Sequence, residues 1–182
     1  KLGEHTDRLY KSLRLVGIKK PCSRERLELL IYKTLKINKL TDAYIKVSVT
    51  RGEGRLGIGH ADTLTPNLII TAKNFDGYPA RMYERGISVT YVTLRQDESS
   101  VLSGIKSHNF LGYILARSEA QKKGYDEAVI VNMKGHIAEA VTSNIFLVRK
   151  DVLITPSLES GILPGITRKT VIDIARRLKI RV

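Results

Sequence analysis

Apolar residues recur every three or four positions in several stretches of the chain, which is the spacing of one buried helix face. The first such stretch covers residues 4–16 and ends at Gly17. Ser23 is a suitable N-cap for the next helix, because its hydroxyl can accept a hydrogen bond from the first turn. Further helices are expected over residues 109–123 and 166–178. In the former, the face expected to point inward carries Phe110, Leu111, Ile114, Leu115 and Ser118.

Segments with alternating or β-branched residues lie between these helices and predict strands. The strands are expected at Ala43–Thr50, Leu68–Lys73, Ile87–Thr93, Glu127–Met133, His136–Glu139, Asn144–Val148 and Val152–Thr155. Turns at Lys134-Gly135 and Lys150-Asp151 would join the later strands into hairpins. Helices and strands therefore interleave, and the expected fold class is mixed α/β (α+β).

A polar stretch at residues 95–102, with Gln96, Asp97 and Glu98, is typical of a linker. We therefore expect a smaller lobe over residues 1–94 and a larger lobe over residues 103–182. A cleft between two lobes is a common place for a ligand.

The composition is that of an ordinary globular protein. Of the 182 residues, 42% are hydrophobic and 27% are charged, which provides a core and excludes a disordered chain. No apolar run approaches the roughly 20 residues that a membrane-spanning helix needs. Cys22 is the single cysteine, so an intramolecular disulfide is impossible. We expect a cytoplasmic protein without a membrane partner.

The formal net charge of +13 raises the question of nucleic-acid binding. The basic residues are spread along the whole chain, aromatic residues make up 6%, and tryptophan is absent. RNA-binding modules stack bases on exposed aromatic side chains, so a lysine-rich solvated surface is the better interpretation. The chain begins without methionine and ends where a strand starts, at Lys179–Val182, which is typical of an excerpt from a longer protein.

Lys106 lies between an apolar residue and an expected helix start, where Ser107 or Asn109 could cap the helix. Partial desolvation and the positive potential of a helix start would both favour the neutral amine that imine formation requires. A solvated surface lysine is the alternative, and the local context alone favours that alternative.

Two other segments are suited to bind a cofactor. Leu163–Arg168 turns directly into an amphipathic helix, where free backbone N–H groups and the Thr167 hydroxyl can bind phosphate. Many helices begin with Pro-Gly, however, and bind nothing. Glu139 lies between Ala138 and Ala140 on a strand expected to face inward, where a carboxylate needs a partner such as a pyridinium nitrogen. A solvated carboxylate at a strand end fits the same pattern.

The remaining polar residues are less informative. Arg8, on the first expected helix, is either a solvated charge or a phosphate ligand. The glycine-rich stretch at residues 51–59 does not follow a strand-to-helix turn, so a dinucleotide fingerprint fits poorly. No metal site is expected, because metal-ligand spacing is lacking among the histidines His5, His60, His108 and His136.

Taken together, four segments resemble the fold-type IV pyridoxal-phosphate enzymes: the branched-chain aminotransferases, D-amino-acid aminotransferases and aminodeoxychorismate lyases. The segments occur in the family's order, and the likeness extends from about Glu4 to the end of the chain. They are EHTDRLYKS, IKSHNFLGYILARSEAQKKGYDEAVIVN, GHIAEAVTSNIFLV and TPSLESGILPGITR. The resemblance implies the family's two-lobed fold, with the cofactor in the cleft between the lobes.

The resemblance also implies a cofactor, pyridoxal 5'-phosphate, and roles for single residues. Lys106 would be the catalytic residue, which holds the cofactor as a Schiff base and moves the proton during transamination. Glu139 would pair with the pyridine nitrogen. Further cofactor contacts would come from Arg8, Asn144, Leu163, Gly165, Ile166 and Thr167, and substrate contacts from Tyr44 and Lys46.

Among the members of this family, the chain looks most like the branched-chain aminotransferases. That likeness implies a homodimer that transfers the amino group of leucine, isoleucine or valine to 2-oxoglutarate. D-amino-acid transamination and aminodeoxychorismate lysis are the alternatives within the family, and a non-catalytic basic binding module is the alternative outside it. The D-amino-acid enzymes carry an arginine and a histidine close together, whereas here Arg55 is followed by Leu56 and His60 lies further on.

The chain departs from the family pattern at a few positions. Phe110 replaces a common tyrosine, Ala140 replaces a usual glycine, and Lys46 replaces the arginine of some relatives. Phe110 lacks a hydroxyl and Lys46 lacks a bidentate fork, which affects the expected substrate preference more than cofactor binding. As an excerpt, the chain is expected to lack the family's N-terminal strands and its C-terminal part.

Overall fold

The computed structural model describes residues 1–54 and 64–182. Most of the expected glycine-rich loop lies outside these residues, as do Arg55 and His60. The chain divides into two units, Lys1–Pro79 and Ala80–Val182.

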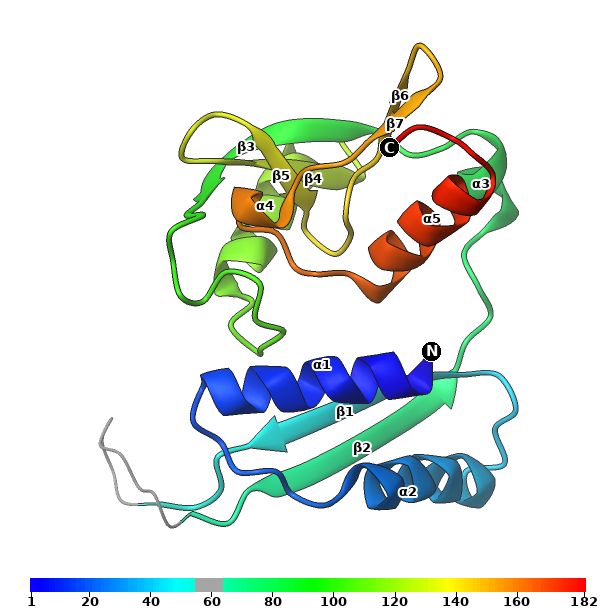
Figure 1. Cartoon of the computed structure of the whole chain (residues 1–182), viewed down its shortest axis with the longest axis vertical. Coiled ribbons are helices and arrows are strands. Elements are labelled where there is room, and N and C mark those ends of the chain that lie inside the picture. The colour runs from blue at the N-terminus through cyan, green and yellow to red at the C-terminus, as the bar shows by residue number, and fades with distance from the viewer. Residues whose placement is uncertain (55–63) are drawn as a thin grey trace. The chain divides into compact units, whose positions relative to one another are not determined.

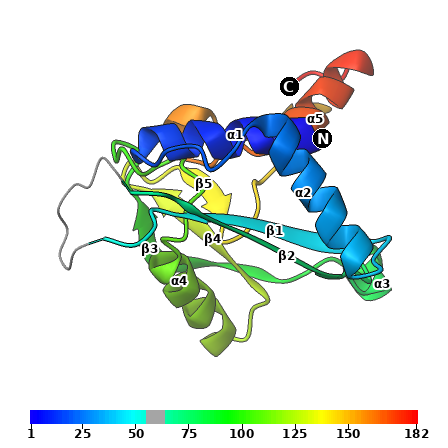
Figure 2. The ribbon, with the colours of Figure 1, turned by 90° about the horizontal axis from the view of Figure 1, so that it is seen from below.

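In the first unit, the described residues form a two-stranded antiparallel ribbon, β1 (Ala43–Thr50) and β2 (Asn67–Asn74). The helices α1 (Leu2–Leu15) and α2 (Arg24–Ile37) pack on one face of this ribbon (Figure 2). The core between them contains Tyr10, Leu13, Leu27 and Ile31 of the helices and Ile45, Val47, Val49, Leu68 and Ile70 of the strands. Alternation along the strands leaves mostly polar side chains on the other face of the ribbon, together with the exposed Ile69.

The helix and strand predictions for this unit are confirmed, including the cap at Ser23. The Ser23 hydroxyl accepts a hydrogen bond of 3.2 Å from the Arg26 N–H. The C-terminal end of α1 is capped by Arg51, whose guanidinium donates a hydrogen bond to the carbonyl of Val16 at 2.8 Å. The buried Tyr10 hydroxyl lies 3.0 Å from the carbonyl of Cys22 and so ties α1 to the segment before α2.

The second unit is built on a β-α-β element. β3 (Val89–Gln96) pairs in parallel with β4 (Glu127–Asn132), and α4 (Leu111–Lys122) connects them (Figure 1). A parallel pair needs such a crossover connection, and a helix that covers the sheet is the usual one. A short helix that the sequence did not predict, α3 (Ala80–Glu84), precedes β3.

Two hairpins and a final helix complete this unit, as predicted. β5 (Ile137–Ala140) pairs antiparallel with β4, and β6 (Leu147–Arg149) pairs with β7 (Val152–Ile154). The 3₁₀ helix η1 (Leu158–Ser160) and the helix α5 (Ile166–Arg177) follow. β6 begins later than expected, because the segment with Asn144 turns, with the Ala140 N–H bonded to the Ser143 carbonyl at 2.8 Å.

The prediction of the inward face of α4 is wrong. Within this unit, Leu111, Ile114 and Leu115 are each more than 60% exposed, whereas Ala116 and Ala120 are buried. The two alanines pack with Val92, Ala128 and Ile130 of the sheet. Small side chains let the helix lie close to the strands, so the larger apolar residues of α4 are turned away from this contact.

The polar stretch at residues 95–102 begins inside β3, which reaches Gln96 and belongs to the second unit through its pairing with β4. The two units meet at Pro79, earlier in the chain than the expected end of the small lobe at Leu94. The lobe and linker assignment stays a prediction. Among the described residues, no helix combines the length and apolar character of a membrane span.

Candidate active site

Glu139 on β5 is the most enclosed charged group among the predicted site residues. It is only 6% exposed, and its neighbours Ala138 and Ala140 are buried as well. The hydroxyl of Tyr113 donates to Oε1 of Glu139 at 3.1 Å. On the other side, the Leu163 N–H donates to Oε2 at 3.0 Å, and Nδ2 of Asn144 lies 3.4 Å from the same oxygen. The predicted inward carboxylate therefore has partners on both oxygens.

The surroundings of Glu139 act on its pKa in opposite directions. Burial raises the pKa of Glu139, and this effect exceeds the lowering by the hydrogen bonds from Leu163 and Tyr113 and by the charge of Lys106. Burial and the nearby carboxylate also raise the pKa of Tyr113. Tyr113 therefore stays protonated, and its hydroxyl donates a hydrogen bond to the carboxylate.

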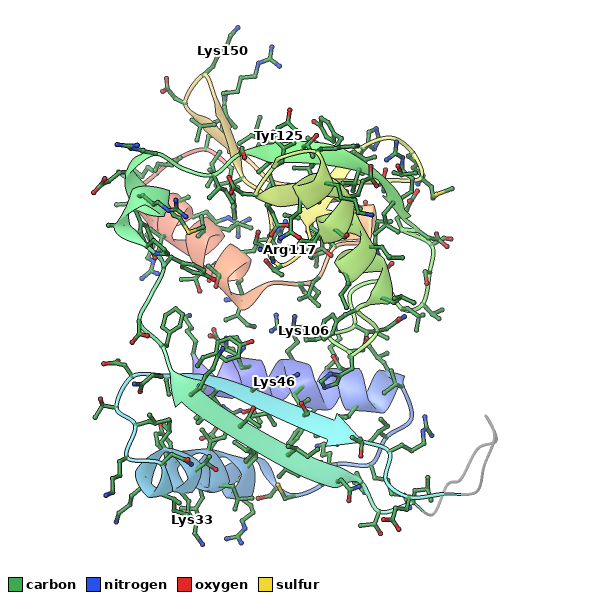
Figure 3. The ribbon with its side chains drawn as sticks, turned by 180° about the vertical axis from the view of Figure 1, so that it is seen from behind. Lys33, Lys46, Lys106, Arg117, Tyr125 and Lys150 are labelled. Atoms are coloured by element: carbon green, nitrogen blue, oxygen red, sulfur yellow. The ribbon has the colours of Figure 1, made fainter. Side chains whose placement is uncertain are left out.

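A cavity of about 270 Å³ lies beside this carboxylate, entirely within the second unit. Its lining includes Lys106, Phe110, Tyr113, Glu139, Asn144 and Leu163. Lys106 lies in the loop before α4 (Figure 3), with Nζ 5.8 Å from the ring centre of Phe110. The loop thus brings an amine and a carboxylate to the same cavity.

One detail of the expected setting of Lys106 is wrong, namely the helix cap beside it. The side chain itself is exposed in this unit, and its partial desolvation stays a prediction. α4 begins only at Leu111, with Phe110 as its N-cap and no capping side chain, so neither Ser107 nor Asn109 caps the helix. The Ser107 hydroxyl instead accepts a hydrogen bond from the Asn109 N–H at 3.2 Å within the loop.

The turn before α5 is fastened to Glu139 through Asn144. Nδ2 of Asn144 donates to the Leu163 carbonyl at 3.0 Å, while the Leu163 N–H bonds to Glu139. Gly165 is the N-cap of α5, and a Cβ atom there would overlap Oδ1 of Asn144. Glycine at this position lets the asparagine side chain lie directly against the turn.

The first turn of α5 is held from its other side as well. The guanidinium of Arg168 donates to the Pro156 carbonyl at 2.8 Å and to the Thr155 hydroxyl at 3.3 Å. The first N–H groups of a helix have no acceptor within it, and they point towards the N-terminus. Ile166 and Thr167 therefore present backbone donors beside Gly165, in a turn whose position is fixed.

The predicted substrate residues lie in the first unit. Tyr44 and Lys46 on β1 share the open face of the ribbon with Thr71 and Lys73 on β2, and together they line a hollow there. Nζ of Lys73 lies 5.6 Å from the ring centre of Tyr44. This face therefore combines an aromatic ring, two hydroxyl groups and two ammonium groups.

Arg8 also lies in the first unit, on α1. It is half-buried, and burial lowers the pKa of its guanidinium. Within the second unit, Lys106, Glu139, Asn144 and Leu163 line one cavity. The grouping of Arg8, Tyr44 and Lys46 with that cavity stays a prediction.

Tyr113, which contacts Glu139, is not among the site residues predicted from the sequence. It lies three positions after Phe110, the N-cap of α4, and two side chains at this spacing lie on neighbouring parts of one helix face. A tyrosine within a stretch that was otherwise assigned to apolar packing was the available signal, because a buried hydroxyl needs a partner.

Comparison with known protein families shows to which family the chain belongs. The model of the class IV aminotransferases matches residues 1–182. The chain belongs to this family. The resemblance in the four sequence segments and the mixed α/β fold class are thereby confirmed.

Individual relatives of this class IV aminotransferase chain are similar over its whole length. A putative branched-chain-amino-acid aminotransferase of Methanocaldococcus jannaschii is 38% identical over 182 residues, which are all of this chain and 62% of that protein. The crystal structure of the branched-chain aminotransferase of Escherichia coli matches with a TM-score of 0.94 at 29% identity, over 100% of this chain and 60% of that one. The chain thus spans about three fifths of the length of these relatives.

Two further structures are informative about chemistry. A putative 4-amino-4-deoxychorismate lyase of Legionella pneumophila matches with a TM-score of 0.90 at 27% identity, over 100% of this chain and 65% of that one. The branched-chain aminotransferase of Thermobaculum terrenum in its PLP-form matches with a TM-score of 0.88 at 30% identity, over 100% of this chain and 59% of that one. The fold is therefore shared by a transaminase and a protein described as a lyase.

Proposed function

We propose that this protein transfers the amino group of branched-chain L-amino acids to 2-oxoglutarate, with pyridoxal 5'-phosphate as its cofactor. The observation that carries the proposal is the buried carboxylate of Glu139 on a cavity that also exposes Lys106 and is tied to the N-terminus of α5. An amine, a buried acid and a helix N-terminus are the groups that an aldehyde, a pyridine nitrogen and a phosphate require.

The residues of this cavity fit the cofactor. Nζ of Lys106 would bind its aldehyde carbon, and Glu139 would accept a hydrogen bond from its pyridine nitrogen. The backbone of Ile166 and the hydroxyl of Thr167 would hold its phosphate, with Arg8 as a further ligand. When bound, pyridoxal phosphate supplies an electron-withdrawing ring that stabilises negative charge on the substrate's α-carbon.

The protein's own residues would then move the proton and hold the charges. Glu139 would be engaged with the pyridine nitrogen, so the amine of Lys106 would take the α-proton of the substrate and return it to the cofactor's aldehyde carbon, on the other side of the substrate's nitrogen. Ionised Glu139 would keep the pyridine nitrogen protonated. Asn144 would hold Glu139 and the Leu163 turn at a fixed separation, through its bonds to both.

The open face of the β1–β2 ribbon supports the substrate assignment. Tyr44 offers an apolar ring for a branched side chain, and Lys46 offers a cation for a carboxylate. In one half-reaction the branched side chain of the amino acid would occupy this face. In the other, the second carboxylate of 2-oxoglutarate would lie in the same place, where an ammonium group can bind it. We also expect the family's homodimer and a cytoplasmic location.

Aminodeoxychorismate lysis is a second candidate, and the similarity to the Legionella pneumophila protein supports it. Both reactions would use Lys106 and Glu139 in the same way, so the substrate face decides between them. D-amino-acid transamination is the remaining alternative within the family. Each is tested by offering valine, D-alanine and aminodeoxychorismate to the full-length protein and measuring the 2-oxo acid or 4-aminobenzoate formed.

The first experiment is an absorbance spectrum of the full-length protein with pyridoxal phosphate, for the wild type and for Lys106→Ala. The expected result is a long-wavelength band in the wild type that is lost in the variant. Borohydride reduction followed by mass spectrometry should place the cofactor on the peptide that contains Lys106. A wild-type protein without the band would refute the proposal, and duplex DNA binding with a steep salt dependence would then favour a basic binding module.

A further inference from the structure

We propose that Tyr113 is a positioning residue for Glu139, whose hydroxyl holds the carboxylate ionised and in a fixed orientation. The inference rests on the proposed function, because an ionised Glu139 is needed to accept a hydrogen bond from a pyridinium N–H. Tyr113 itself lies on α4 and acts through Glu139.

The direction of the hydrogen bond follows from a chain of contacts that starts in the loop after β3. The Ser103 hydroxyl lies 2.6 Å from the Asp97 carbonyl. A carbonyl can only accept a hydrogen bond, so the serine hydroxyl is the donor in this pair. Oγ of Ser103 must therefore accept from Gln96, whose amide nitrogen lies at 2.9 Å. This arrangement turns the amide oxygen of Gln96 towards Tyr113, at 3.4 Å.

Tyr113 thus faces an acceptor on each side, and its single proton can go to either. Oε1 of Glu139 is nearer, at 3.1 Å against 3.4 Å for Gln96, and it carries charge when ionised. Charge-assisted hydrogen bonds are shorter and stronger than neutral ones. The proton is therefore donated to ionised Glu139.

The hydrogen bond between Glu139 and Tyr113 can have the carboxyl group as its donor only if Glu139 is protonated. Its Oε2 accepts from Leu163 and Asn144, so the proton would lie on Oε1 and would be donated to the tyrosine oxygen. Tyr113 would then have to donate to Gln96. Burial favours this neutral form of Glu139. The hydrogen bond from the Leu163 N–H opposes it, as do the hydrogen bond from the Tyr113 hydroxyl and the charge of Lys106.

Two substitutions should therefore move Glu139 in opposite directions. Tyr113→Phe removes the donor to Oε1, which favours the protonated acid. Gln96→Leu removes the acceptor that the tyrosine needs when Glu139 is protonated, which favours the ionised acid. A residue that only filled space would give no such opposition of sign, because both changes remove a polar contact from the same place.

The test is a titration of the Glu139 carboxyl in the cofactor-free, full-length protein, by ¹³C NMR with the signal assigned through Glu139→Gln. Tyr113→Phe should raise the pKa of Glu139 by about one, a tenfold change in proton affinity, since a hydrogen bond to a charged group is lost. Gln96→Leu should lower it by a smaller amount. Tyr125→Phe, at an exposed tyrosine of the same unit, is the control and should leave the titration unchanged.

The cofactor gives a second readout that separates this inference from the proposed function. In Tyr113→Phe, the pH dependence of the long-wavelength band should shift, and kcat should fall at least tenfold with little change in KM. An unchanged Glu139 titration in Tyr113→Phe, or shifts of the same sign in both variants, would overturn the inference even if the wild type binds pyridoxal phosphate. A wild type that does not bind it would instead refute the proposed function and the cofactor role of Tyr113 together.

Discussion

Gly165→Ala is the substitution with the most direct structural consequence, because its new methyl group would occupy the position of Oδ1 of Asn144. The backbone of Gly165 has φ −67° and ψ 133°, which alanine adopts without strain. The asparagine amide must therefore move, and its bonds to the Leu163 carbonyl and to Glu139 are weakened or lost.

The expected cost follows from those two hydrogen bonds. Each contributes on the order of 1 kcal/mol to stability, so their loss should cost about 2 kcal/mol. The poorer N-cap propensity of alanine, about 0.5 kcal/mol, is offset by the lower entropy that alanine gives the unfolded chain. For a domain of this size, a loss of about 2 kcal/mol corresponds to a fall in Tm of about 4–8 °C.

The assay is urea denaturation, followed by circular dichroism, of Gly165→Ala, Asn144→Ala and the double variant. If the methyl group acts through Asn144, it should have little effect once Asn144 is replaced. The free energies of unfolding of the double variant and of Asn144→Ala should then agree within about 0.5 kcal/mol. Gly112→Ala in α4 is the matched control, since a Cβ there meets only Leu94 at 3.6 Å and alanine favours helix. Additive losses, or a Gly165→Ala variant as stable as the wild type, would refute the reasoning.

Three further predictions concern charge. Burial raises the pKa of Glu139, so the folded protein binds this proton more tightly than the unfolded chain does. The contribution of this group to stability should therefore fall as pH rises above about 4.5. In urea denaturation, Glu139→Gln should lack this part of the pH dependence of stability. Hydrogen bonds from Lys123 and Thr93 lower the pKa of Glu119, so its contribution to stability should be present at neutral pH and should decrease as pH falls below its ordinary pKa of 4.5. The difference in stability between wild type and Glu119→Gln, measured by urea denaturation, should therefore shrink as the pH is lowered through this range. Lys46→Ala should raise KM for 2-oxoglutarate about fivefold, the loss of roughly 1 kcal/mol from an exposed ion pair, whereas Lys33→Ala on α2 should not.

The sequence was sufficient for those parts of the fold that periodicity and turn chemistry determine. The helices, the Ser23 cap and the hairpins are examples, because each depends on a few neighbouring residues. The inward face of α4 was predicted wrongly, since counting large apolar residues overlooks that Ala116 and Ala120 allow the closest approach to the sheet.

The candidate site was predictable to a different degree. Resemblance to a family located Lys106, Glu139 and Asn144, which do line one cavity. The contact of Tyr113 with Glu139 joins residues 26 positions apart on a helix and a strand, and no local pattern encodes such a pairing. The same applies to Gln96, which was assigned to a linker, and to Ser103 just after it. Both form part of the hydrogen-bonded chain that reaches Tyr113.

The link between Glu139, Asn144 and the Leu163 turn has a kinetic consequence. These groups are already hydrogen-bonded to one another, so the turn before α5 does not have to be ordered by an arriving ligand. Association with pyridoxal phosphate should then lack a slow rearrangement at this turn, and the observed rate of capture should rise linearly with cofactor concentration in stopped-flow experiments. The asparagine would thus preorganise the phosphate end and the nitrogen end of the site as a single rigid piece.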